Sequence, residues 1–216
     1  LKESSWGRLK TTWPYYTGPA WTSIQTGKKI SNHGMANFFK YDSDLNIRLA
    51  TGNDLKEKTF YELADQNNYK CLVMNLPYTY PPKTEGDTIF SWLHIHDKVE
   101  DLCHPTSLIH DYPSLNNYKN RGDRTSSVTK YLETGEEMLI SQGRSLKEIF
   151  LAKKHDLYFF LLNAADLIQH KVFSELIKGE TNKDVVISKR ILKHLDSIVK
   201  WVDENKEEKD IVLITS

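Results

Sequence analysis

The sequence predicts an α/β domain with a largely parallel sheet and helices on both faces. Three short apolar runs, at residues 70–76, 157–162 and 211–215, have the composition of strands that are buried on both faces. Stretches with helical spacing of apolar residues lie between these runs, and such an alternation is typical of a parallel sheet. We therefore expect residues 157–162 and 211–215 to be neighbouring strands.

The remaining elements follow from the same patterns. Rough alternation of polar and apolar residues over residues 6–13 predicts an edge or connecting strand. Residues 77–124 are rich in Pro, Asn, Asp and Tyr, so we expect an irregular excursion with a small strand near residues 88–96, acting as a lid or substrate loop. Apolar residues recur at helical spacing in four stretches. The predicted helices cover residues 59–66, 127–154, 166–178 and 183–206.

The composition excludes several classes of function. Lys and Arg number 29, as do Asp and Glu, so the net charge is 0 and no nucleic-acid or membrane surface is indicated. No apolar run approaches the length of a membrane span. Cys71 and Cys103 are too few for a disulfide framework, and Cys71 lies in a core-like run. A reducing cytoplasm is the expected location, and the oligomeric state is left open.

Residues 17–27, TGPAWTSIQTG, place a hydroxyl at the start of a helix. Pro19 suits the first helical turn because its missing N–H would have no partner there. The free N–H groups of that turn and the helix dipole form an anion site beside Thr17. A hydroxyl at an anion site suits phosphoryl chemistry, although Gly-Pro before a helix often does no more than begin it.

Asp166 follows the apolar run of residues 157–162 and therefore falls at the carboxyl edge of the predicted sheet, where ligands bind in α/β folds. His170 comes four residues later, so one helical turn can direct both side chains at a single metal ion. The alternative is an Asp that caps a helix, with a surface His one turn on.

Together these motifs resemble the alkaline phosphatase superfamily, in its branch of type I phosphodiesterases and nucleotide pyrophosphatases, and most closely its uncharacterised microbial members. Asp166 and His170 match the metal motif of that family, and residues 75–82, NLPYTYPP, are similar to a segment after an early strand in the microbial members. The positions that match the nucleophile motif are Thr17, Thr26, Gly27, His33 and Gly34.

The resemblance implies a metal-dependent hydrolase of small-molecule phosphoric esters, of the phosphodiester or nucleotide pyrophosphate type. Thr17 is then the catalytic nucleophile and forms a phospho-threonine intermediate. Two divalent ions, zinc by expectation and manganese as the alternative, would be held by Thr17, Asp166 and His170. By the same resemblance, His33 belongs to a structural turn after the nucleophile helix. The ester that is hydrolysed is not named by the sequence.

Two departures from the family pattern bear on these expectations. Nucleotide pyrophosphatases have a phosphate-contacting Asn 21 residues after the nucleophile, where this chain has Phe38, so Asn37 is the candidate substrate-binding residue through a shift of one position. The family also has a metal-binding Asp on an opening strand, an Asp-His pair after the last strand and a later His, all missing here. We therefore expect residues 1–216 to be one incomplete catalytic domain that is inactive alone.

Other interpretations stay open at this point. His94 and His96 would share one face of a strand near Asp97 and His104, which could form a zinc site. The sequence lacks a four-ligand zinc spacing, and its 8 histidines make chance clusters an alternative. The alternative functions are a phosphomutase or sulfatase-like relative, whose members use Ser or formylglycine where Thr17 stands, and a non-catalytic α/β binding module.

Overall fold

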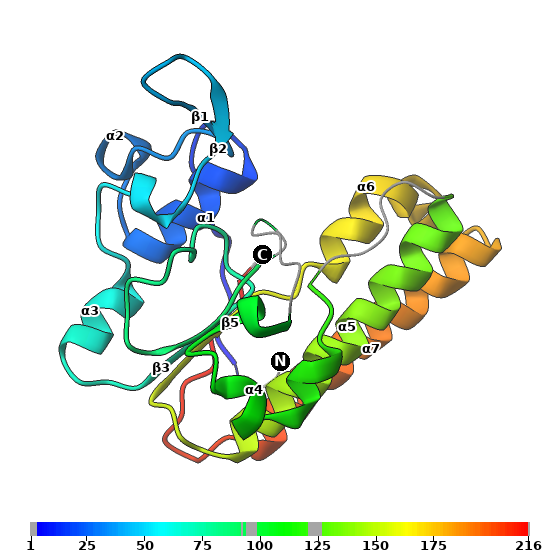
Figure 1. Cartoon of the computed structure of the whole chain (residues 1–216). Coiled ribbons are helices and arrows are strands. Elements are labelled where there is room, and N and C mark those ends of the chain that lie inside the picture. The colour runs from blue at the N-terminus through cyan, green and yellow to red at the C-terminus, as the bar shows by residue number, and fades with distance from the viewer. Residues whose placement is uncertain (1–3, 92, 94–98, 121–126, 216) are drawn as a thin grey trace.

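A four-stranded sheet, in the order β5-β4-β3-β6, forms the centre of the protein in this computed structural model, which describes residues 4–91, 93, 99–120 and 127–215 (Figure 1). Strand β3 pairs in parallel with β4 and with β6, and β5 pairs with β4 in antiparallel orientation. The strands are β3 (Cys71–Met74), β4 (Asp87–Ile89), β5 (Cys103–His104) and β6 (Leu157–Phe160). The expected largely parallel sheet is confirmed.

The predicted helices are also confirmed, with ends that differ by a few residues. The side chains of Thr59, Ser127 and Asn182 each accept a hydrogen bond from the first turn of the helix that follows, which explains where α3, α5 and α7 begin. The α-helices are α1 (Thr17–Thr26), α2 (Ile30–His33), α3 (Phe60–Gln66), α4 (Leu108–Asp111), α5 (Val128–Leu151), α6 (Ala164–Ile177) and α7 (Lys183–Asn205). The other elements are the strands β1 (Phe39–Tyr41) and β2 (Ile47–Leu49) and the 3-10 helices η1 (Gly52–Asp54), η2 (Val99–Leu102) and η3 (Pro113–Asn117).

Helices cover both faces of the sheet. Leu72 and Met74 of β3 pack into a cluster formed with α5, α6 and α7, the group on the right in Figure 1. Cys71 and Val73, which alternate with them along the strand, pack with Tyr61 of α3 on the other face. Each fully buried side chain of this kind contributes about 1.5–3 kcal/mol to stability. An apolar strand without alternation is therefore the expected composition for β3.

Residues 211–215 do not form a strand, so the prediction that they pair with residues 157–162 is wrong. Ile211 and Leu213 are 94% and 87% exposed, and β6 has β3 as its neighbour in the sheet. An apolar run becomes a buried strand only where another strand pairs with it and helices cover it. The structure provides neither for this run among the described residues.

Residues 6–13 are not a strand either. Trp6 and Trp13 are 84% and 79% exposed, and the segment leads to α1 without regular structure. Alternation of side chains predicts a strand only where one face is covered, and here neither tryptophan is. The prediction of an edge strand was therefore wrong.

The excursion after β3 contains more structure than its sequence predicts. The small strand expected near residues 88–96 is β4, which begins at Asp87, ends at Ile89 and lies inside the sheet. After it come η2, β5, α4 and η3, each of 2 to 5 residues. Elements this short cannot develop a detectable periodicity, which explains why the sequence appears irregular.

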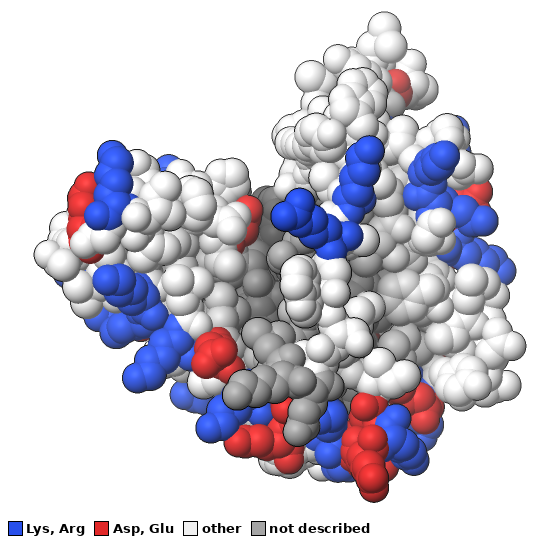
Figure 2. Space-filling view, turned by 180° about the vertical axis from the view of Figure 1, so that it is seen from behind, with Lys and Arg blue, Asp and Glu red and all other residues white. Residues whose placement is uncertain are grey.

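Charged side chains of both signs lie on the surface, and both cysteines lie in the interior. Figure 2 shows acidic and basic side chains intermingled along one edge of the face that it draws. Cys71 and Cys103 are buried and not bonded to each other, and burial raises the pKa of each thiol to about 11. Within the described part of the chain, no helix is both long enough and apolar enough to cross a membrane.

Candidate functional site

Thr17 is the first residue of α1, as expected, and follows the cap residue Tyr16. Its side chain is exposed, and its hydroxyl has no hydrogen-bond partner within the described residues. The first hydrogen bond at this end runs from the Ala20 N–H to the Tyr16 carbonyl, at 3.1 Å. The N–H groups of Thr17 and Gly18 precede it and are free to bind an anion, since the first turn of a helix leaves its donors unpaired.

Gly18 allows the start of α1 to lie against a buried tyrosine. A Cβ at Gly18 would stand 2.5 Å from the hydroxyl oxygen of Tyr78 and 3.6 Å from the carbonyl carbon of Asn37. The Tyr78 hydroxyl donates a hydrogen bond to the Asn37 carbonyl, at 3.3 Å. The close approach explains why glycine follows Thr17. It also places Asn37 beside the residue next to the candidate nucleophile.

The side chain of Asn37 is exposed, whereas the side chain of Phe38 packs against aromatic rings. The Phe38 ring lies 5.3 Å from the Tyr16 ring, edge to face, and 6.1 Å from the Tyr78 ring. The Asn37 side chain is exposed, and its Oδ1 accepts a hydrogen bond of 2.7 Å from the Phe38 N–H. The Asn37 amide is therefore exposed, while the Phe38 ring packs against the rings of Tyr16 and Tyr78.

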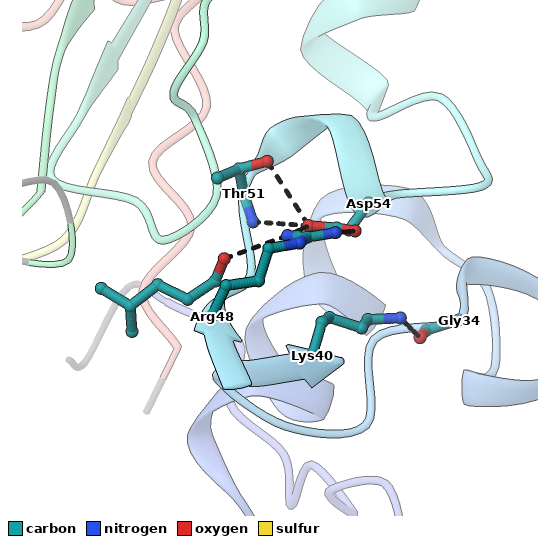
Figure 3. A network of polar contacts seen from close by, with 6 residues as sticks. Gly34, Lys40, Arg48, Thr51 and Asp54 are labelled. Atoms are coloured by element: carbon teal, nitrogen blue, oxygen red, sulfur yellow. Dashed lines mark hydrogen bonds and ion pairs between the residues drawn. The ribbon is translucent and has the colours of Figure 1, made fainter. Parts of the chain in front are cut away.

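The hairpin of β1 and β2 follows Asn37 and is held to the body of the protein by its polar face (Figure 3). Two hydrogen bonds of 2.7 and 2.8 Å join the Arg48 guanidinium to the Asp54 carboxylate, and Lys40 Nζ donates to the Gly34 carbonyl at 2.9 Å. The Arg48 hydrogen bonds, aided by the Thr51 N–H, lower the pKa of Asp54 to about 2. These contacts hold the hairpin, which follows Asn37 in the chain, against Gly34 and η1.

Asp166 and His170 lie on one face of α6, as the spacing predicts. His170 Nε2 is 3.3 Å from Asp166 Oδ1, and the two side chains are 69% and 62% exposed. Asp166 is in the first turn, where the helix dipole favours a negative charge. The pair can therefore turn toward an ion, and it also fits the plainer role of a first-turn carboxylate with a neighbouring surface His, since the cap residue of α6 is Asn163.

His33 is a structural residue in this fold. It is fully buried, its Nδ1 accepts a hydrogen bond of 3.1 Å from the Met35 N–H, and its Nε2 lies 3.1 Å from Ser23 Oγ. The accepting Nδ1 requires the proton on Nε2, which donates to Ser23. Burial lowers the pKa of His33, against a smaller opposing effect of Glu57. A neutral ring thus joins α1 to the turn after α2.

The segment that contacts the start of α1 and the segment that leads into α6 leave the same edge of the sheet. Tyr78, four residues after β3 ends, contacts the start of α1, and α6 begins at Ala164, four residues after β6 ends. Because β3 and β6 are parallel, both points lie at the carboxyl edge. The convergence of the Thr17 hydroxyl with Asp166 stays a prediction.

The described residues contain no cluster of three His, Cys, Asp or Glu side chains that could hold a metal ion. His94, His96 and Asp97 lie outside the described residues, so the hypothesis of a zinc site there stays a prediction. Asp166 and His170 supply two ligands of the types that zinc and manganese accept.

A family model described as type I phosphodiesterase / nucleotide pyrophosphatase matches residues 1–215. The chain belongs to this family. The type I phosphodiesterases are part of the alkaline phosphatase superfamily, hydrolyse phosphoesters and are typically metal-dependent. The family resemblance noted from the motifs is therefore confirmed.

Two solved structures are similar to this type I phosphodiesterase chain. Both are phosphonoacetate hydrolase from Sinorhizobium meliloti 1021, in complex with phosphonoacetate and with phosphonoformate. Each match has 14% sequence identity and a TM-score of 0.46, and covers 87% of this chain and 44% of that chain. The chain thus spans less than half the length of these proteins. No curated protein matches the sequence.

The sequence did not reveal the contacts that residues 75–82 make with α1 and with the end of β6. Tyr78 and Asn75 belong to the segment of residues 75–82 that was noted for its resemblance, yet their contacts with Gly18 and Leu161 are distant in sequence. The one local signal was the glycine directly after Thr17, which indicates a close approach by another group.

Proposed function

We propose that this chain carries part of the active site of a metal-dependent hydrolase of phosphoric esters, of the phosphodiester or nucleotide pyrophosphate type. The observation that carries the proposal is the exposed Thr17 hydroxyl at the start of α1, in a chain whose family hydrolyses phosphoesters. The proposed substrate is a small-molecule phosphate ester. Asn37, beside Gly18, is the proposed contact to a phosphoryl oxygen.

The proposed chemistry uses Thr17 as nucleophile. Its Oγ attacks phosphorus and its proton passes to solvent, while one alcohol of a diester, or one phosphate group of a pyrophosphate, leaves and takes up a proton from solvent, which gives a phospho-threonine intermediate that still carries the other ester group. Water then cleaves the bond between phosphorus and Thr17 Oγ, which restores the hydroxyl and releases a phosphomonoester. The N–H groups of Thr17 and Gly18 and the helix dipole offset negative charge on the phosphoryl oxygens throughout.

Asp166 and His170 fit a divalent ion by their chemistry and spacing. They are a carboxylate and an imidazole one helical turn apart, both exposed, with 3.3 Å between Oδ1 and Nε2. With Thr17 they would hold part of the ligand set of two ions, zinc or manganese. Such ions, when bound, favour the ionised form of a hydroxyl nucleophile and neutralise phosphoryl charge. A catalytic ion takes about three protein ligands, so this set is partial.

The family match and an assay of hydrolysis distinguish the proposed function from the alternative functions. The family match favours hydrolysis over the phosphomutase and sulfatase-like functions. A non-catalytic binding module would keep the fold and bind phosphate esters without releasing an alcohol.

The test uses the full-length protein that contains this chain and an aryl phosphodiester that releases a coloured alcohol. A chelator should abolish the activity, and Zn²⁺ or Mn²⁺ should restore it. Thr17→Ala should lower kcat by roughly 10³-fold or more, because it removes the attacking oxygen. Thr17→Ser should retain part of the activity because it keeps that oxygen.

Thr181→Ala is the matched control, since Thr181 is also exposed but precedes α7. It should hydrolyse the diester at the parent rate. A Thr17→Ala variant as fast as the parent would exclude Thr17 as the nucleophile and favour the binding module.

A further inference from the structure

Asn75 lies where three parallel strands reach the carboxyl edge of the sheet. It directly follows β3, is 4% exposed and has a left-handed backbone with φ 63°. Its N–H donates a hydrogen bond of 2.9 Å to the carbonyl of Ile89, the last residue of β4. Asparagine tolerates this conformation better than most residues, so the turn after β3 can begin at this position.

The Asn75 side chain adds one more hydrogen bond between the end of β3 and the end of β6. Its Nδ2 donates a hydrogen bond of 3.1 Å to the carbonyl of Leu161, the residue that follows β6. Leu161 in turn donates its N–H to the Met74 carbonyl, at 3.0 Å. The end of β3 therefore holds Leu161 by two hydrogen bonds, one at its N–H and one at its carbonyl. Of the described residues, Leu161 is the last before α6 that is bonded to the sheet.

A second group holds Asn75 from the side of α5. The Tyr118 hydroxyl donates a hydrogen bond of 2.6 Å to Asn75 Oδ1. Lys119, next in the chain, is bonded to α5 through Ser141 Oγ at 3.0 Å and through Gln142 Nε2 at 3.0 Å. Both ends of the Asn75 amide are thus engaged, and its rotation is fixed.

Asn75 also begins the segment that contacts α1. The Pro77 carbonyl accepts a hydrogen bond of 3.1 Å from Gln25 Nε2, near the end of α1. Tyr78 stands against Gly18 at the start of α1. Two residues after Asn75 the chain is therefore bonded to the helix that carries Thr17, while the Asn75 side chain is bonded to the segment that leads into α6.

We propose that Asn75 is a positioning residue, which sets the start of α6, with Asp166, against the start of α1, with Thr17. This inference rests on the proposed function for its catalytic consequence, but not for its geometry. Asp166 is five residues beyond Leu161, so a shift of that carbonyl moves the first turn of α6. A displacement of about 1 Å at a reacting group can cost about 100-fold in rate.

The first arm of the test measures the spacing of α1 and α6 without any reaction. Spin labels on Lys28→Cys, just after α1, and Ser174→Cys, on α6, occupy exposed positions, while Cys71 and Cys103 of this chain are buried, which shields them from the label. Asn75→Gly removes the amide and suits the positive φ. It should shift or broaden the distance distribution in the full-length protein.

Asn68→Gly is the matched control, because Asn68 has φ 65° and is exposed after α3. It should leave the distance distribution unchanged. An Asn75→Gly distribution identical to that of the parent would overturn the inference, whatever happens to hydrolysis.

The second arm measures hydrolysis of the aryl phosphodiester. Asn75→Gly should lower kcat by about 10- to 100-fold with a smaller change in KM, because the bound ester would meet a displaced site. Asn75→Asp keeps the acceptor for Tyr118 but faces the Leu161 carbonyl with an oxygen, so it should fail to rescue. Tyr118→Phe keeps the ring, loses one hydrogen bond and should show a smaller decrease of kcat.

These arms separate the failure of the inference from the failure of the proposed function. A shifted distance with parental kcat in Asn75→Gly would refute the positioning role. Full activity in Thr17→Ala would refute the proposed function, and the distance arm would still decide whether Asn75 sets the spacing of the helices. If Asn75→Gly folds poorly, Tyr118→Phe provides the test instead. A Tyr118→Phe protein with the kcat and the label distances of the parent would overturn the inference.

Discussion

Replacing Gly18 by alanine tests the packing of the candidate nucleophile helix. The added Cβ would stand 2.5 Å from the Tyr78 hydroxyl oxygen, so the ring must retreat by about 1 Å to restore van der Waals contact. Tyr78 is 4% exposed and has little room to move. Overpacking of this kind costs about 1–3 kcal/mol, and the strained hydrogen bond to Asn37 adds up to about 1 kcal/mol.

A smaller effect opposes this cost. Alanine is favoured over glycine in a helix by up to about 1 kcal/mol. We therefore expect Gly18→Ala to destabilise the protein by about 1–3 kcal/mol, or several degrees in Tm for a chain of this size. Urea unfolding followed by circular dichroism measures the change. Gly7→Ala is the control, because a Cβ at Gly7 meets no atom within 4 Å.

A double-mutant cycle identifies the cause. Tyr78→Phe removes the oxygen that the new Cβ would meet, and the nearest ring carbon lies 3.6 Å away, an ordinary contact. In this background Gly18→Ala should cost less than about 0.5 kcal/mol, so the coupling energy between the two sites should be large. An equal cost in both backgrounds would refute the reasoning, as would a Gly18→Ala protein as stable as the parent.

Two further predictions concern pH. The pKa of Asp54 is lowered to about 2 by the Arg48 hydrogen bonds, so the contribution of this carboxylate is complete above pH ~4 and is lost as the pH falls through about 2. Because Arg48 is 44% exposed, solvent screening reduces the contribution to about 1 kcal/mol. The difference in free energy of unfolding between the parent and Asp54→Asn, measured in urea, should therefore become smaller from pH ~5 to pH ~2.5. A difference that stays constant would contradict this. Burial lowers the pKa of His33 in the folded protein, so protonation favours unfolding and stability should fall as the pH drops below ~6.5. The His33→Gln variant should lack this component, and the same pH dependence in both proteins would argue against it.

The sequence predicted the elements whose signal is local. The core strand β3 and the helices α5 and α7 are visible in composition and periodicity because burial on both faces, or along one stripe, determines their residues. Thr17 was placed correctly because proline and helix-start chemistry act over a few residues. These features depend on the nearest neighbours in the chain.

The remaining features depend on tertiary context. Residues 211–215 have the composition of a buried strand, yet their pairing depends on whether another strand is available. The contacts of Tyr78 with Gly18, and of Asn75 with Leu161, join residues 60 and 86 positions apart, and nothing local encodes them. The partners that hold a site are therefore less visible in sequence than its reactive groups.

The central claim is that Thr17 becomes phosphorylated during turnover. The direct measurement is mass spectrometry of the full-length protein, quenched in acid during hydrolysis of an aryl phosphodiester and digested to peptides. The account predicts a phosphoryl-containing adduct on the peptide that includes Thr17, localised to its hydroxyl and absent from Thr17→Ala and from protein treated with chelator. Active protein that shows no adduct at Thr17 at any quench time, or an adduct on another residue that persists in Thr17→Ala, would contradict it.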